Sequence, residues 1–341
     1  MKILVTGGAG FIGSAFIRYM LREHDDVQVV NFDALTYAGN LDNLIDVARN
    51  PRYSFIKGDI CDANAVTASL RGVDTVVHFA AESHNDRGVL DPGIFFRTNV
   101  MGTQTLLEAC RKAGNIRFHH ISTDEVFGDL GLDEPRSWTE LEPRKPRTPY
   151  SASKAASDHV VAAYGHTFGL PVTISNCCNN LGPCQFPEKL IPLFATNALE
   201  DRPLPLFRSS QNRREWIHAD DHSAAVDAIL QKGRIGEAYN IGTGVEKSVE
   251  EITDAILATL GKPHTLKTYV PDRPGHDRRY AIDSAKLRTE TGWAPKISFE
   301  EGMRQTVEWY RDNPQWWMRV KTGEYQKYYD TYYRQTLGAT V

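Results

Sequence analysis

Five residues suited to proton transfer lie in two short segments of this chain. Thr123-Asp124-Glu125 ends an apolar stretch typical of a strand, and Tyr150 and Lys154, four apart, begin 25 residues after Glu125. On a helix this spacing puts the phenol and the ammonium on one face, where the ammonium favours the phenolate and lowers the tyrosine pKa from about 10. Neighbouring carboxyls can hold different protonation states. Together these groups would serve a hydride transfer coupled to loss of water.

A glycine-rich segment near the start of the chain predicts a dinucleotide site. Residues 7–13 follow a short apolar strand and open a helix, so their backbone N–H groups can approach a pyrophosphate. Asp33 ends the next strand, where a carboxylate can hold a ribose diol and would repel a 2′-phosphate. NAD is therefore favoured over NADP; a tight turn without ligand is the alternative. The contacts expected on this ground are Gly7, Gly10, Phe11, Ile12, Gly13, Asp33, Asp59, Ile60, Ala80 and Ala81.

The elements that would position these residues follow a strand-helix alternation. Strands are expected at 3–6, 27–32, 53–57, 75–79, 118–122 and 172–175. A helix near 93–113 would face inward with Phe96, Val100, Thr103, Leu107 and Cys110, and a second one would span 151–168. This pattern predicts an α/β fold, a Rossmann-type doubly wound parallel sheet with a smaller C-terminal substrate-binding lobe.

The division into domains is predicted from composition, because the second half is richer in proline, arginine and aromatic residues. The NAD-binding domain would comprise residues 1–175, 211–241 and about 285–308. The lobe would comprise 176–210, 242–284 and 309–341, with an aromatic and polar tail at 309–333 as a surface cover.

Composition bounds the function classes. The 43 acidic and 39 basic residues of the 341 give a net charge of −4, so neither a nucleic-acid nor a membrane partner is indicated. Five cysteines without paired metal spacing predict free thiols in a reducing compartment, and no metal is expected. No segment is apolar and long enough for a signal peptide or membrane span, so a cytoplasmic protein is expected.

The motifs together resemble the extended short-chain dehydrogenase/reductases, and more narrowly the dTDP-glucose 4,6-dehydratases among them. The resemblance covers nearly the whole chain. The segments that carry it are 6–14, 35–40, 80–84, 122–126, Tyr150 with Lys154, 179–180, 185–192 and 272–277. Its specific part is the Asp124-Glu125 pair, because related epimerases and decarboxylases keep the tyrosine and lysine but generally not both acids.

The resemblance implies a role for each reacting group. Tyr150, assisted by Thr123 and Lys154, would deprotonate the glucose C4 hydroxyl as hydride passes to a tightly bound NAD. Glu125 would remove the C5 proton and Asp124 would protonate the departing C6 hydroxyl, after which hydride returns to C6 and NAD is regenerated. It also implies a homodimer formed through the two long helices.

Further contacts rest on the same resemblance. NAD would also meet Leu35, Thr36, Gly39, Ser83, Asn99, Ser122, Tyr150, Lys154 and Asn180. The nucleotide sugar would meet Ser83, His84, Thr123, Asn179, Glu188, Lys189, Leu190, Pro205, Phe207, Arg214, His276 and Tyr280. Arg214 is the favoured diphosphate ligand, because a guanidinium suits a diphosphate in fork geometry; a surface ion pair is the alternative.

Other functions remain open at this point. A UDP-sugar 4,6-dehydratase or a nucleotide-sugar C4 epimerase would use the same Tyr150 and Lys154, although an epimerase has no use for Asp124 and Glu125. A non-catalytic NAD-binding regulator is an alternative of a different class. It would have no need of these four side chains.

Overall fold

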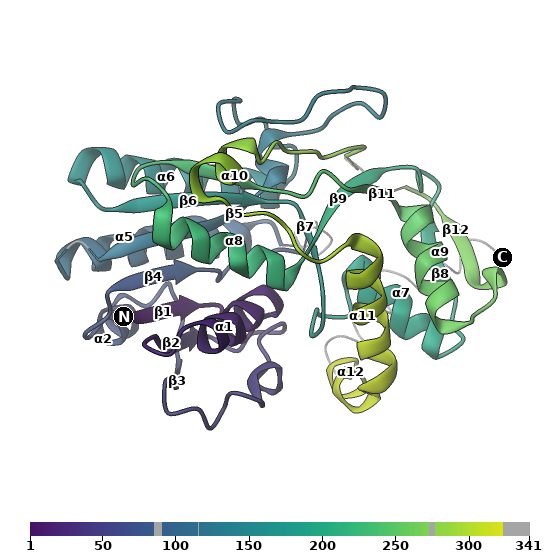
Figure 1. Ribbon diagram of the computed structural model, residues 1–341, viewed down its shortest axis with the longest axis horizontal. Helices are drawn as coiled ribbons and strands as arrows, with labels where there is room; N and C mark the ends of the chain where they lie inside the picture. Colours follow the sequence, from purple (N-terminus) through teal and green to yellow (C-terminus); the bar gives the residue numbers. More distant parts are fainter. Residues whose placement is uncertain (85–90, 115, 273–276, 323–341) are drawn as a thin grey trace.

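The computed structural model describes residues 1–84, 91–114, 116–272 and 277–322 (Figure 1). The main sheet contains β1 (Lys2–Thr6), β2 (Gln28–Asp33), β3 (Tyr53–Lys57), β4 (Thr75–His78), β5 (Arg117–Thr123), β6 (Val172–Cys177) and β10 (Ala238–Ile241). The helical segments of this part are α1 (Phe11–Glu23), η1 (Leu41–Leu44), α2 (Ala63–Ser69), α4 (Gly93–Phe95), η2 (Phe96–Gly102), α5 (Thr103–Lys112), η3 (Asp124–Phe127), α6 (Pro149–Phe168), α8 (Ala219–Lys232) and α10 (Ala285–Thr291).

The sheet is parallel throughout and has the order β10-β6-β5-β4-β1-β2-β3. The order reverses between β1 and β4, and ligands of such sheets bind at the carboxyl ends of the strands beside this point. The expected strands are confirmed to within two residues, and so is the doubly wound fold class.

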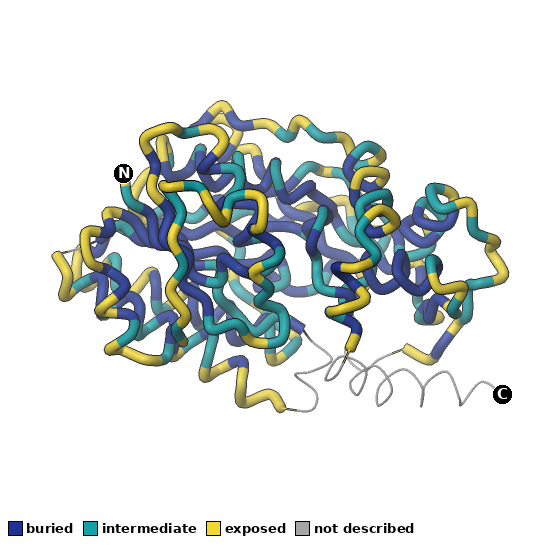
Figure 2. The backbone as a smooth tube through the Cα atoms, turned by 90° about the horizontal axis from the view of Figure 1, so that it is seen from below, coloured by how far each residue is buried: buried dark blue, intermediate teal, exposed yellow. Residues whose placement is uncertain are grey.

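Apolar strands explain why the sheet is buried on both faces. In β1 the side chains of Ile3, Leu4 and Val5 are all fully buried, the continuous pattern of a sheet covered on both sides. One core cluster packs α1 and α8 on one face, and another packs α2, α5 and α6 on the opposite face. Figure 2 shows buried backbone gathered in the interior and exposed backbone at the periphery.

Helix α6 starts and stops on recognisable local signals. Thr148 caps it in a capping box with Ser151, Pro149 occupies its first turn, and Gly169 ends it in the left-handed conformation. These caps place Tyr150 in the first turn and Lys154 one turn later, so the spacing prediction for this pair is confirmed.

The other long helix differs from its expected pattern. Residues 93–112 form α4, a π-helical stretch η2 and α5, instead of one regular α-helix. Phe96 is 44% exposed and Val100 only partly buried, whereas Phe95 and Asn99 face the interior. The prediction for Phe96 and Val100 is wrong because the wider π-helical turn rotates this stretch relative to α5. The inward positions of α5 itself are confirmed.

A smaller lobe packs at the carboxyl edge of the sheet. Its elements are β7 (Asn179–Leu181), α7 (Leu190–Leu199), β8 (Leu204–Phe207), β9 (Arg213–His218), β11 (Glu246–Ser248), α9 (Val249–Leu260), η4 (His264–Leu266), β12 (Lys267–Val270), α11 (Phe299–Asp312) and α12 (Pro314–Val320). They form a three-stranded sheet, β11-β9-β7, and a two-stranded one, β12-β8, around a separate apolar core.

The C-terminal helices differ from the expectation in two respects. Residues 299–308, expected with the main sheet, lie in α11, which packs against α7 and α9 of the lobe. Trp316 and Trp317, within the expected surface cover, are instead buried in the lobe core. The Trp317 indole N–H donates to the Tyr310 carbonyl on α11, and the Trp316 indole N–H donates to Asn43 on η1. Residues 213–218, also expected with the main sheet, form β9 in the three-stranded sheet of the lobe. The rest of the domain division stays a prediction, and residues 323–341 lie outside the described part.

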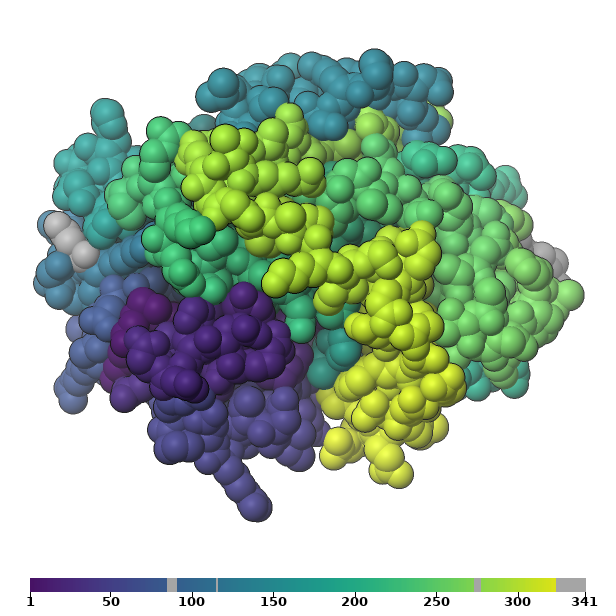
Figure 3. All heavy atoms as spheres, in the orientation of Figure 1, coloured from purple at the N-terminus to yellow at the C-terminus, as the bar shows by residue number. Residues whose placement is uncertain are grey.

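An early segment of the chain packs against its last described helices on one face. In Figure 3 the N-terminal segment in purple lies beside α11 and α12 in yellow, and Trp316 Nε1 donates a hydrogen bond to Asn43 Oδ1 at 2.9 Å across this junction. Among the helices that the structure describes, none is long and apolar enough to cross a bilayer.

Candidate active site

The glycine loop between β1 and α1 leaves room for a ligand to approach its backbone. Gly7 has a φ of 70°, and a Cβ there would lie 2.6 Å from the Ala80 backbone nitrogen. Only glycine therefore fits where the ends of β1 and β4 come together. Gly10 is the N-cap of α1 and forms no side-chain cap, so the first backbone N–H groups of α1 face the switch point.

Asp33 organises the loop that follows β2. Its carboxylate accepts hydrogen bonds from the backbone N–H groups of Ala9 and Leu35, at 2.9 and 2.8 Å. Burial raises the pKa of Asp33, and the two N–H donors oppose that rise. Each oxygen keeps a lone pair, so the residue fits a ribose diol. Leu35 is held at a φ of 54°, a strained conformation of the kind found at ligand sites.

The remaining predicted NAD contacts lie at the carboxyl ends of other strands. Asp59 and Ile60 follow β3, Ala80, Ala81 and Ser83 follow β4, Ser122 ends β5, and Asn180 lies on β7; Thr36 and Gly39 are in the loop after β2. Asn99 is buried on η2, where its amide bonds both backbone groups of Glu82 and the Ser153 hydroxyl. It therefore fastens the loop after β4 to α6.

The two acids occupy different environments at the end of β5. Thr123 is the N-cap of η3: its hydroxyl accepts from the Glu125 N–H at 3.3 Å and donates to Asp124 Oδ1 at 3.2 Å. Asp124 is 2% exposed, and its Oδ2 has no hydrogen-bond partner among the described residues. Burial, together with the charges of Glu125 and Glu215, raises the pKa of Asp124 well above its usual value. Glu125 is half-buried. The structure thus favours a neutral Asp124 beside a second carboxyl group.

Tyr150 and Lys154 share a helix face, but their electrostatics differ from the expectation. Tyr150 contacts the Thr123 hydroxyl, and burial with the charge of Glu125 raises the pKa of the phenol. Lys154 donates to the Ile121 carbonyl at 2.6 Å, and burial lowers the pKa of its ammonium to about 8. The expected lowering of the tyrosine pKa is therefore not found, because burial of the phenol, followed by the charge of Glu125, raises its pKa.

The predicted sugar-nucleotide residues form two groups. In the first, Lys189 Nζ donates to the Ser83 carbonyl at 2.7 Å, and His84 Nε2 lies 3.5 Å from Glu188 Oε2. These contacts join the loop after β4 to the lobe segment before α7. Asn179 on β7 and Leu190 at the start of α7 lie at the two ends of the chain segment that holds Glu188 and Lys189.

The second group surrounds Arg214 on β9. Its guanidinium carbon lies 4.4 Å from the centre of the Tyr280 ring, and its Nη2 donates to the Asp277 carbonyl at 2.8 Å. Arg214 also lowers the pKa of Asp124 against the effect of burial, so it lies near the acids. Pro205 and Phe207 alternate with Leu204 and Leu206, which face the lobe core. His276 lies outside the described residues.

Glu215 is a site residue that the sequence did not indicate. It is fully buried, and its carboxylate accepts hydrogen bonds from the backbone N–H groups of Gly244 and Ile282, at 2.7 and 3.1 Å. Its charge helps to raise the pKa of Asp124. The only sequence signal for Glu215 is the alternation of a strand, which puts Arg214 and Glu215 on opposite faces. It does not say which of the two faces the interior.

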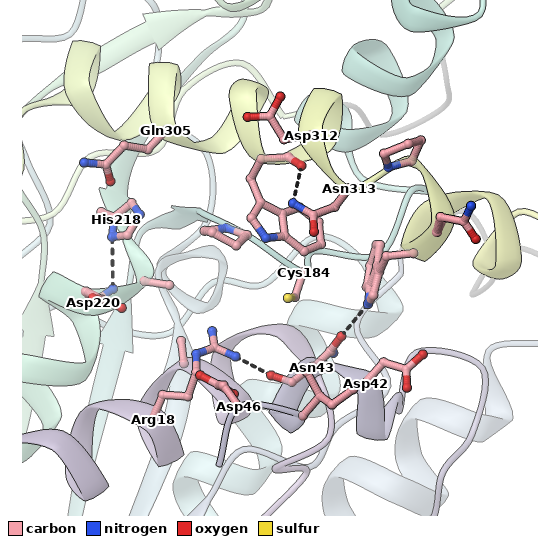
Figure 4. Close-up of a pocket in the computed structure, with 18 of the residues that line it drawn as sticks. Arg18, Asp42, Asn43, Asp46, Cys184, His218, Asp220, Gln305, Asp312 and Asn313 are labelled. Atoms are coloured by element: carbon pink, nitrogen blue, oxygen red, sulfur yellow. Dashed lines mark hydrogen bonds between the residues drawn. The ribbon is translucent and has the colours of Figure 1, made fainter. Parts of the chain in front are cut away.

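A cavity of about 590 Å³ lies elsewhere, between α1 and η1 on one side and α11 and α12 on the other. Figure 4 shows Arg18, Cys184 and His218 along its walls. None of the predicted site residues lines it, and charged groups at its rim pair with each other, as Arg319 does with Asp42 at 2.8 Å. Within the described ranges, no cluster of three histidine, cysteine or acidic side chains could hold a metal ion.

The fold and these carboxyl groups define a class of enzyme, and comparison with known proteins agrees. A family model described as GDP-mannose 4,6 dehydratase matches residues 4–306. The dTDP-glucose 4,6-dehydratase of Neisseria meningitidis is 49% identical over 95% of this chain and 97% of its own length. The chain belongs to the nucleotide-sugar 4,6-dehydratase family, among the dTDP-glucose 4,6-dehydratases.

Solved structures point to the same family. The dTDP-glucose 4,6-dehydratase of Streptomyces venezuelae, with NAD and TYD bound, has a TM-score of 0.91 and 49% identity, covering 94% of this chain and all of that one. A UDP-glucose 4-epimerase of Thermus thermophilus in complex with NAD has a TM-score of 0.83 and 31% identity, covering 92% of this chain and all of that one.

Proposed function

We propose that this protein converts dTDP-glucose to dTDP-4-keto-6-deoxyglucose and water, with NAD as a tightly bound cofactor regenerated in each turnover. The single observation that carries the proposal is the buried Asp124, whose pKa is raised beside Glu125. Loss of a hydroxyl needs an acid that is still protonated at working pH, and removal of a carbon-bound proton needs a base. These two groups are adjacent here.

The first step is oxidation at C4. Tyr150 would take the C4 hydroxyl proton as its phenolate, which the Lys154 ammonium and the positive nicotinamide of bound NAD would favour against the raised pKa of the buried phenol. The Thr123 hydroxyl, which contacts Tyr150, orients the C4 oxygen. NAD supplies the hydride acceptor at C4 and, in its reduced form, the hydride donor at C6. Lys154 is fixed by the Ile121 carbonyl, and its ammonium offsets the negative charge that Tyr150 carries while it acts as a base.

The second step is elimination of water across C5 and C6. The new 4-ketone acidifies the C5 proton, which Glu125 removes. Asp124 gives its proton to the C6 hydroxyl, so that water leaves and a C5–C6 double bond forms. Hydride then adds to C6, and the proton held by Glu125 returns to C5. Tyr150 is left with the proton from the C4 hydroxyl and Asp124 without its own, so one proton passes from Tyr150 to Asp124 through solvent before the next turnover, and NAD is unchanged overall.

The binding residues support a diphosphate-linked sugar. We assign the diphosphate to Arg214, whose orientation is fixed by the Asp277 carbonyl and the Tyr280 ring. Asn179, Glu188 and Lys189 would face the sugar, and Pro205 with Phe207 the base. For NAD, the residues after β1 and β2 fit its pyrophosphate and ribose, as the Asp33 geometry indicates.

The experiment is incubation of the purified protein with dTDP-glucose or UDP-glucose, without added cofactor. We expect mass spectrometry to find a product lighter by one water with dTDP-glucose, and no lasting reduced nicotinamide. Preference for UDP-glucose would assign a different base. Isomerisation without loss of water would mean an epimerase, and absence of turnover with both sugars would favour a regulator.

We also infer a homodimer and a cytoplasmic location. Four apolar side chains on α4, η2 and α6 are 39–58% exposed: Ile94, Phe96, Met101 and Phe168. Exposed apolar side chains on these helices support packing against the same helices of a second copy. All five cysteines are free, which suits a reducing compartment.

The dimer is tested by Met101→Glu with light scattering. We expect this variant to be a monomer, because a buried carboxylate in an apolar interface is costly. Met318→Glu is the matched control, since Met318 is 53% exposed on α12, away from that face. A dimer that withstands Met101→Glu would contradict the assigned interface.

A further inference from the structure

A cluster of charges that no role has yet explained joins the catalytic segments to the lobe. Arg147 Nη1 lies 2.8 Å from Asp129 Oδ2, and its Nε lies 3.2 Å from Asp277 Oδ1. Asp129 comes four residues after Glu125, and Arg147 three before Tyr150. The Arg147 guanidinium therefore links three segments: its own, which leads into α6; the one that contains Glu125 and Asp129; and the one that begins at Asp277.

Backbone contacts make this junction rigid. Asp129 Oδ1 accepts from the N–H groups of Arg278 and Arg279, at 2.6 and 3.1 Å, and the Leu130 N–H donates to the Arg279 carbonyl at 3.0 Å. Gly128 turns the chain toward this contact with a φ of 89°, and a Cβ there would lie 2.5 Å from the Lys145 carbonyl oxygen. The loop after η3, which contains Gly128, Asp129 and Leu130, therefore lies beside the segment 277–280.

The same segment continues to the proposed diphosphate ligand. Asp277 is 3% exposed, accepts a hydrogen bond from the Tyr280 hydroxyl, and offers its backbone carbonyl to Arg214. The Tyr280 ring covers the Arg214 guanidinium. A continuous chain of contacts therefore runs from Asp129 through Arg147 and Asp277 to Arg214, without touching a reacting atom.

We propose that Asp129 and Arg147 are positioning residues, which set the place of Arg214 relative to Asp124, Glu125 and Tyr150. The inference rests on the proposed function and deepens it, because it couples binding of the diphosphate in the lobe to the proton-transfer groups on the sheet. Arg147 is the cation between two carboxylates, so its removal leaves Asp129 and Asp277 to repel each other. The segment 277–280, and with it Arg214, then loses its fixed distance from β5.

The test compares Asp129→Asn, Arg147→Gln and Arg214→Gln, alone and combined. We expect Asp129→Asn and Arg147→Gln to raise KM for dTDP-glucose and weaken dTDP binding in calorimetry, each by about 5- to 20-fold, with kcat within about threefold. Because they act through Arg214, neither should add to the defect of Arg214→Gln. Arg147→Lys, which keeps the charge, should recover part of the affinity.

Glu308→Gln is the matched control, because it breaks the exposed ion pair with Arg304 on α11. It should leave KM and dTDP affinity unchanged. Additive defects in the double variants, or a fall in kcat at unchanged KM, would overturn the positioning role. Wild-type protein that binds dTDP but turns over no sugar would count against the proposed function alone. Calorimetry of dTDP binding would still measure how Asp129 and Arg147 act through Arg214. Wild-type protein that binds no dTDP would overturn both.

Discussion

The proton-transfer groups and the nucleotide-facing groups of this enzyme are built in opposite ways. Thr123, Asp124 and Glu125 are consecutive, and Tyr150 and Lys154 lie one turn apart on α6. The proposed chemistry therefore needs only two short segments. The residues around Arg214 come from β9, from 277–280 and from the loop after η3. Chemistry is thus encoded locally, whereas recognition depends on how distant segments pack.

The two regions also differ in what fixes their charges. Asp124 is controlled by burial and by neighbouring carboxylates, which hold its pKa high. Arg214 is controlled by oriented carbonyls and an aromatic ring, which fix its direction. A substitution in the first region should therefore change reaction steps, and one in the second should change affinity.

The largest expected effect is in the local region. Glu125→Gln and Asp124→Asn each remove one proton-transfer partner and should slow water loss by about 10²- to 10⁴-fold. Oxidation at C4 should persist, so reduced nicotinamide should accumulate in a single turnover followed by absorbance. Mass spectrometry of the sugar provides the second readout. If both variants retained full dehydration, the assigned roles would be wrong.

A smaller effect is expected in the assembled region. Arg214→Gln removes a charged donor to the diphosphate and should raise KM for dTDP-glucose about 10- to 100-fold, with kcat close to wild type. The neighbouring Arg213→Gln serves as control, because Arg213 is 42% exposed and lies 3.8 Å from Glu251. If Arg214→Gln lowered kcat and left KM unchanged, Arg214 would act in the reaction steps instead of in binding. The two regions would then not differ in the way described.

The smallest effect concerns stability. The folded pKa of Asp124 is raised above the unfolded value of about 3.9, so the folded state holds a proton that the unfolded state has lost. Stability should therefore fall as pH rises from about 4 toward the folded pKa, by at most about 1.4 kcal/mol per pH unit. Asp124→Asn removes this dependence.

Thermal unfolding across pH checks that prediction. The variant should melt above wild type at pH near 8 and equal to it near pH 4; because unfolding entropy grows with chain length, each kcal/mol shifts Tm by ~2 °C or less in a chain of 341 residues. If the difference in Tm between wild type and Asp124→Asn were the same at every pH, burial of the Asp124 carboxylate would have no energetic cost. The local region would then lack the electrostatic control described for it.

Sequence reasoning succeeded where a short pattern has one geometric solution. The four-residue spacing of Tyr150 and Lys154 on one helix is such a pattern. It failed for Phe96 and Val100, because a π-helical turn leaves no mark in apolar spacing. It also failed for the pKa of Tyr150, since the distance from the phenol to Glu125 depends on how β5 and α6 pack.

The sequence by itself determined the parallel sheet, the glycine loop with Asp33, and the order of proton-transfer residues along the chain. Periodicity and turn chemistry are local properties, so they can be recognised without the fold. Only the tertiary structure decided that Asp124 is buried beside Glu215, that α11 belongs to the lobe, and that Asp129, Arg147 and Asp277 meet. Burial and charge proximity are sums over segments far apart in the chain, so they exist only once those segments pack.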